Sequence, residues 1–132
     1  MPALSALTRL LLVLGLFGSD GRDSSFTAAQ ACPVDIADAQ SQGYDGDMAR
    51  RIADHHRDEL CRCVFTPPKA GVETVLIEYV LTSTGSVAHA HVADTTAEQM
   101  TAECMADVVA TWSFPHGPCG VAIVQQRVNL AR

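Results

Sequence analysis

The sequence has few aromatic and few basic residues. Among 132 residues, one Trp, two Tyr and four Phe are the only aromatics. A chain of this length forms one domain, and so few aromatics predict a small core. Nine Lys and Arg against fifteen Asp and Glu give a net charge of -6, the wrong sign for a surface that neutralises phosphates. The composition therefore excludes a multidomain enzyme and disfavours nucleic acid as a partner.

The motifs of several enzyme classes are also missing. There is no G-x-x-x-x-G-K, no G-x-S-x-G, no H-E-x-x-H and no paired C-x-x-C. Glu59 follows His55 by four residues and could pair with it on a helix surface, but an exposed pair of this kind is not catalytic. His56 lies on the apolar side of the same segment and is expected to be hydrogen-bonded and half-buried. We therefore expect no enzymatic activity, no cofactor and no small-molecule substrate.

One long apolar run occurs, at the N-terminus. Residues 10–17 (LLLVLGLF) follow the single cation Arg9 and precede polar residues. The run is shorter than the roughly 20 residues needed to cross a bilayer, but it suits the apolar part of a signal peptide. We expect residues 1–21 to be a signal peptide and the mature chain to begin between residues 19 and 32. The protein would then be periplasmic or secreted by a bacterium, envelope-associated and without a transmembrane anchor.

The remaining chain divides into an irregular part and a patterned part. Residues 22–46 are rich in Ser, Ala, Gln, Gly and Asp without a sustained period, which predicts an irregular tether. In residues 47–64 the apolar positions fall on one side of a helix, with Cys63 on that side and Cys61 outside it. Pro67 and Pro68 end this helix.

Three strands and a second helix are predicted beyond these prolines. Residues 72–81 and 87–92 alternate as two strands of a hairpin, with a turn that ends at Gly85. Residues 97–112 have the period of a helix, and residues 121–130 form a last strand. Residues 47–132 are therefore expected to form a two-layer α+β domain with the order αββαβ.

Several of these residues resemble a known family. The matching pieces, in chain order, are Leu60-x-x-Cys63, Tyr79-x-Leu81-x-x-x-Gly85-x-Val87, Cys104 and Trp112-Ser113-Phe114-Pro115. They resemble the AgmX/PglI C-terminal domain of bacterial envelope proteins, which is itself similar to the C-terminal domain of the TonB energy transducer. The resemblance implies two helices on one face of a three-stranded antiparallel sheet. It implies no energy transduction, because this chain has no Pro-rich spacer.

The resemblance also implies roles for the cysteines and for the signature residues around Trp112. Five cysteines in an exported chain predict disulfides, and the odd number leaves at least one cysteine over. The family's cysteines match Cys63 and Cys104, which both lie on apolar helix sides, so we expect these two to pair. Cys61 and Cys119 are candidates for a second bridge, and the pairing of Cys32 stays open. The signature residues are Gly85, Trp112, Phe114 and Pro115, and we expect the two aromatics to close the core rather than form an exposed recognition pair.

Histidines and cysteines form the strongest candidate for a metal site. Copper or zinc would accept the side chains of His55, His56, Cys61, Cys63, His89 and His91. Residues two apart on a helix do not face each other, however, so the two cysteines cannot chelate together. The last two histidines share the open side of the predicted sheet and are expected to be a solvated pair. No metal site is therefore predicted, and a periplasmic copper- or zinc-binding protein is the alternative function.

The expected function is binding of an envelope protein or peptide. A three-stranded sheet leaves two edges that can accept an extended peptide as an added strand. Residues 121–130 are the preferred edge, because Gln125, Gln126, Arg127 and Asn129 interrupt their apolar alternation. We therefore expect an exported, non-enzymatic cell-envelope module that binds a protein partner by strand addition.

Overall fold

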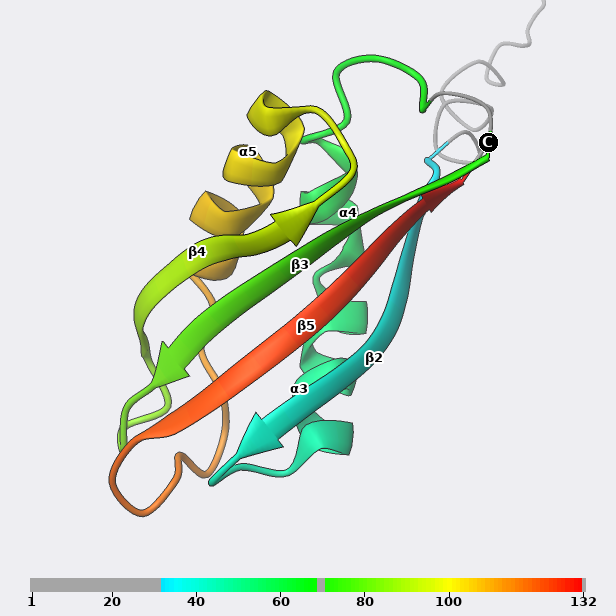
Figure 1. Cartoon of the computed structure of the whole chain (residues 1–132). Helices are drawn as coiled ribbons and strands as arrows, with labels where there is room; N and C mark the ends of the chain where they lie inside the picture. The colour runs from blue at the N-terminus through cyan, green and yellow to red at the C-terminus, as the bar shows by residue number, and fades with distance from the viewer. Residues whose placement is uncertain (1–31, 69–70, 132) are drawn as a thin grey trace, which may run out of the picture. The chain divides into compact units, whose positions relative to one another are not determined.

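The structure is a computed structural model that describes residues 32–68 and 71–131 (Figure 1). The expected signal peptide and cleavage region, apart from Cys32, lie outside these residues. Within the described ranges, no helix has the length and apolar character required to span a membrane.

The chain from Pro33 onward is an α+β fold with one layer of strands and one layer of helices. Four strands form an antiparallel sheet in the order β2 (Val34–Gln42), β5 (Ala122–Ala131), β3 (Val72–Leu81) and β4 (Val87–Thr95). The helices α3 (Gly46–His55), α4 (Arg57–Cys61) and α5 (Gln99–Val109) cover one face of this sheet (Figure 1). The other face carries no helix in the described part of the chain.

The expectation of three strands is wrong, because part of the predicted tether is a strand. Within residues 22–46, the segment Val34–Gln42 pairs with β5 from Val34 opposite Leu130 to Gln42 opposite Ile123. Val34 and Ile36 are buried and supply the apolar contact that this polar segment needs. Strand β5 is consequently bonded on both sides, to β2 and β3, and is not the edge that the sequence suggested. The outer strands are β2 and β4.

Gln126 explains how a polar segment joins the sheet. Its side chain is fully buried on the helix-covered side of β5. Strand β2 has a bulge between Ile36 and Ala39, and Nε2 of Gln126 donates to the carbonyls of Ala37 and Asp38 there, at 3.1 and 3.3 Å. A buried amide N–H without an acceptor costs free energy, so these two bonds favour the pairing of β2 with β5. The glutamine that suggested a guarded edge therefore serves to attach a neighbouring strand.

The hairpin of β3 and β4 forms as predicted, and the segment that follows α5 packs against its turn. Gly85 adopts a φ of 86°, a left-handed conformation that favours glycine. The Phe114 amide donates to the Gly85 carbonyl at 2.8 Å. Trp112 and Phe114 are 2% and 4% exposed, so these aromatics close the core as expected.

The predicted helix over residues 47–64 is interrupted at His56. This residue has φ -99° and ψ 16°, which ends α3 at His55 and lets α4 begin at Arg57. The second predicted helix is present as α5, within the expected range of residues 97–112.

The disulfide between Cys63 and Cys104 joins the segment after α4 to α5, with 5.5 Å between the two Cα atoms. The second expected bridge is wrong, because Cys119 is a free, exposed thiol whereas Cys61 and Cys32 are both disulfide-bonded. Cys119 follows Gly117, which lies against Ser83 in the hairpin turn. Cys61 is the last residue of α4, and this helix lies away from the hairpin turn between β3 and β4 (Figure 1).

Candidate functional site

A shallow groove lies between α4 and α5, directly over the Cys63–Cys104 disulfide. Its rims carry charges of both signs, from Glu59 and Arg62 on one side and Asp107 on the other. Val108 and Thr111 complete its lining. The groove opens to solvent along its length.

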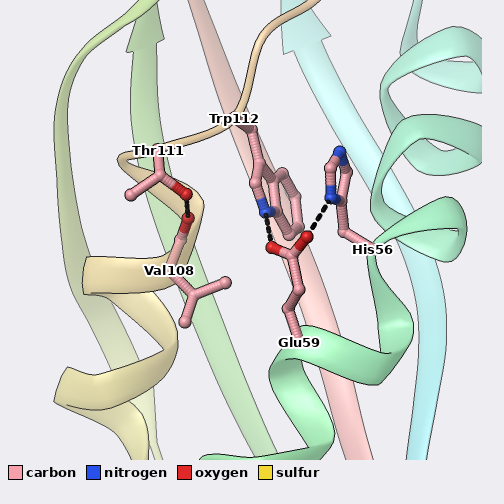
Figure 2. Close-up of polar contacts among 5 residues, drawn as sticks. All are labelled: His56, Glu59, Val108, Thr111 and Trp112. Atoms are coloured by element: carbon pink, nitrogen blue, oxygen red, sulfur yellow. Dashed lines mark hydrogen bonds and ion pairs between the residues drawn. The ribbon is translucent and has the colours of Figure 1, made fainter.

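Glu59 at the end of this groove is held by two side chains (Figure 2). Its Oε2 lies 2.8 Å from Nδ1 of His56, and its Oε1 accepts a hydrogen bond of 3.2 Å from Nε1 of Trp112. The imidazole also stacks on the indole, with 4.9 Å between ring centroids and 17° between planes. The partner of Glu59 is thus His56, three residues away, and not His55 as its sequence spacing suggested.

Hydrogen bonding lowers the pKa of Glu59 below its ordinary value. The bond from His56 is the largest cause, the bond from Trp112 acts in the same direction, and partial desolvation opposes both. The carboxylate is therefore an ionised acceptor at neutral pH. Both of its oxygens are occupied by donors, so the cluster orients Trp112 in the core rather than presenting an acid or base to a substrate.

We expect Glu59→Gln to lower the free energy of unfolding by less than about 1 kcal/mol at pH 7, because the carboxylate is 40% exposed. Since the pKa of Glu59 is lower in the fold than in the unfolded chain, the ionised group stabilises the fold above its ordinary pKa of 4.5. This stabilisation is lost as the pH falls through the folded-state pKa. Urea unfolding should therefore show a difference in the free energy of unfolding between wild type and variant that is smaller at pH 3 than at pH 7.

The control is Glu103→Gln on α5, where the carboxylate is exposed and bonded only to Gln99 in the described structure. This change should shift the free energy of unfolding by no more than about 0.5 kcal/mol at either pH. A gap for Glu59→Gln that is equally large at both pH values would contradict the assigned role of its charge.

A row of polar side chains crosses the helix-free face of the sheet. Glu78 on β3 stands directly opposite Gln125 on β5 and His91 on β4. Nε2 of Gln125 donates to Oε2 of Glu78 at 3.1 Å, and Nε2 of His91 lies 3.3 Å from Oε1 of the same carboxylate. His89 shares this face, and both histidines are exposed, as the alternation predicted. The row joins three strands of the sheet.

The metal constellation suggested by the sequence does not assemble as a whole. Cys61 and Cys63 are oxidised and offer no thiolate, and His56 is bound to Glu59 and stacked on Trp112. In the part of the chain that the structure describes, no group of three or more His, Cys, Asp or Glu side chains could hold a metal ion. His89 and His91 are the members of that constellation that stay together on an accessible surface.

No family model, curated protein or solved structure matches this chain. The resemblance to the AgmX/PglI C-terminal domain therefore stays a prediction that depends on its motif residues.

The roles of Glu59 and Gln126 were missed from the sequence. The spacing of three residues between His56 and Glu59 is a helical contact and could have indicated the first. The second depends on a pairing with β2 that is distant in the sequence.

Proposed function

We propose that this chain is an exported, non-enzymatic cell-envelope module that binds a protein partner by strand addition at β4. The observation that carries this proposal is the outer position of β4, which pairs with β3 on one side and with no described strand on the other. The backbone groups on the unpaired side of such a strand can hydrogen-bond to an extended peptide.

Strand β4 is a better acceptor than the other outer strand. Charged side chains commonly guard an edge, and β4 carries a single one, Asp94, beyond its regular segment. Strand β2 follows Pro33 and carries the exposed charges of Asp35 and Asp38. The edge proposed from the sequence, residues 121–130, is an inner strand and is not available.

The length of the acceptor segment gives selectivity. The register with β3 shifts at Ala88 and again at Ala93, so regular pairing runs from His89 to Val92. Bulges at the ends of an edge strand limit indiscriminate pairing. A partner would add a short strand here, with its alternate side chains placed beside His89 and His91 on the open face.

Export is supported by two independent features. The disulfide between Cys63 and Cys104 suits an oxidising compartment, and residues 1–21 have the pattern of a signal peptide. The motif residues shared with the AgmX/PglI domain support a place in the bacterial envelope.

Proline substitutions in β4 test the proposal. Successive residues of a strand direct their N–H groups to opposite sides, so one of His89→Pro and Ala90→Pro removes a ladder donor and the other removes only an outward donor. The outward variant should fold, as judged by circular dichroism and thermal unfolding. We expect this folded variant to lose a protein that the wild-type chain captures from envelope extracts.

The matched control is the same pair of substitutions in β2, Gln40→Pro and Ser41→Pro, which lie in its regular segment beyond the bulge. The folded member of this pair should capture the partner as well as wild type does. Capture that survives in the folded β4 variant would refute strand addition at β4.

A further inference from the structure

The histidines of β4 form a close pair on the open face of the sheet. Residues two apart on a strand point to the same side, and the ring centroids of His89 and His91 are 5.3 Å apart with 33° between their planes. Both rings are exposed, so an ion can reach them from solvent without any rearrangement of the core.

This separation matches two imidazoles that share one tetrahedral metal ion. Zinc binds an imidazole nitrogen at about 2.1 Å, and the centre of the ring lies about 1.1 Å farther along the same direction. Two such rings at a tetrahedral angle have centroids about 5.2 Å apart. The separation of 5.3 Å in this structure is therefore compatible with one ion shared by both rings without movement of the strand.

Glu78 orients one member of the pair. Its Oε1 lies 3.3 Å from Nε2 of His91, and its Oε2 accepts a hydrogen bond from Gln125. Histidines that bind metals usually donate their other ring N–H to a carboxylate, which sets the tautomer and raises the basicity of the ligand. A proton on Nε2, which the nearby Oε1 of Glu78 favours, would leave Nδ1 of His91 as the nitrogen with a lone pair for the metal.

We propose that His89 and His91 form a zinc-binding site on the open face of β4, with Glu78 as a positioning residue. The two imidazoles supply two ligands, and water fills the other positions of the tetrahedron. The site differs from the strand-addition surface in using side chains of β4 instead of its outer backbone groups. It stands whether or not a protein pairs with that strand.

Titration with Zn²⁺ by isothermal calorimetry tests the site. The protein should carry Cys119→Ser, so that the free thiol is not a competing ligand, and should have oxidised disulfides and no histidine tag. We expect one Zn²⁺ per chain. Either His89→Gln or His91→Gln should weaken binding by about 100-fold or more, since a single imidazole remains, and Glu78→Gln should weaken it by about 10-fold.

The matched control is His55→Gln, which removes an exposed histidine from α3 and should leave the affinity unchanged. Circular dichroism should show that the variants on β4 keep the fold, as expected for exposed positions. Absence of binding to wild type would overturn the proposal. So would an unchanged affinity in the double variant His89→Gln/His91→Gln.

Discussion

Replacing Cys63 and Cys104 together with alanine should lower the free energy of unfolding by about 4 kcal/mol. The disulfide closes a loop with a sequence separation of 41, and the chain-entropy relation gives this value for a loop of that size. A domain of this length has a total stability of only about 5 to 15 kcal/mol. Urea unfolding of the variant and of wild type, followed by circular dichroism, measures the difference.

The control for this prediction is Cys119→Ser. Cys119 is an exposed, free thiol, so its replacement should change the free energy of unfolding by no more than about 0.5 kcal/mol. Variants are preferable to a reductant, because Cys61 is disulfide-bonded as well and would also be reduced. Equal unfolding midpoints for the double alanine variant and wild type would show that the bridge adds nothing to stability.

The position of this bridge explains why its loss should matter. Helices α3 and α4 pack on β2, whereas α5 packs on β4 and β3. The helix layer therefore has two parts over opposite halves of the sheet, and a groove lies between α4 and α5. The disulfide on the floor of that groove links the two parts directly.

The sequence predicted the elements whose pattern is local. Val75, Ile77, Tyr79 and Leu81 alternate with more exposed residues, and they form the buried side of β3 as the period of two required. The second helix also followed from its own period. These elements carry their evidence within about ten residues, so no knowledge of distant contacts was needed.

The sequence did not predict the elements that depend on distant partners. The strand Val34–Gln42 contains two aspartates, two glutamines and a serine, and its β propensity is low. It becomes a strand because β5 provides a ladder and because Gln126 bonds the carbonyls at its bulge. Missing this strand led directly to the error about the edge, since β5 is an edge only when β2 is absent.

The candidate site divides in the same way. The shared face of His89 and His91 followed from strand alternation, so their accessibility was predicted. The bond of Glu59 to Trp112 was not predicted, because the tryptophan is separated from the glutamate by 53 positions. The interruption of the helix at His56 was not predicted either, because the apolar period of residues 47–64 continues through it.

The second large effect is expected for Gly85→Ala, which should lower the free energy of unfolding by about 3 kcal/mol or more. The φ of 86° is unfavourable for a residue with a side chain. A Cβ at this position would also overlap the carbonyl oxygen of Phe114. The change would push away the segment that bonds to the Gly85 carbonyl and carries the buried rings of Phe114 and Trp112.

Gly120→Ala separates the two causes, because Gly120 has a similar φ of 97° but nothing within 4 Å of an added Cβ. In Gly120→Ala the added Cβ meets the same unfavourable φ but overlaps no other atom. This control should therefore lower the free energy of unfolding by only about 1 kcal/mol. The difference of about 2 kcal/mol between the two variants then measures the docking of Phe114 on the hairpin turn. Equal losses in urea unfolding would mean that backbone conformation alone explains the glycine, and that the contact between the turn and the chain after α5 can relax without cost.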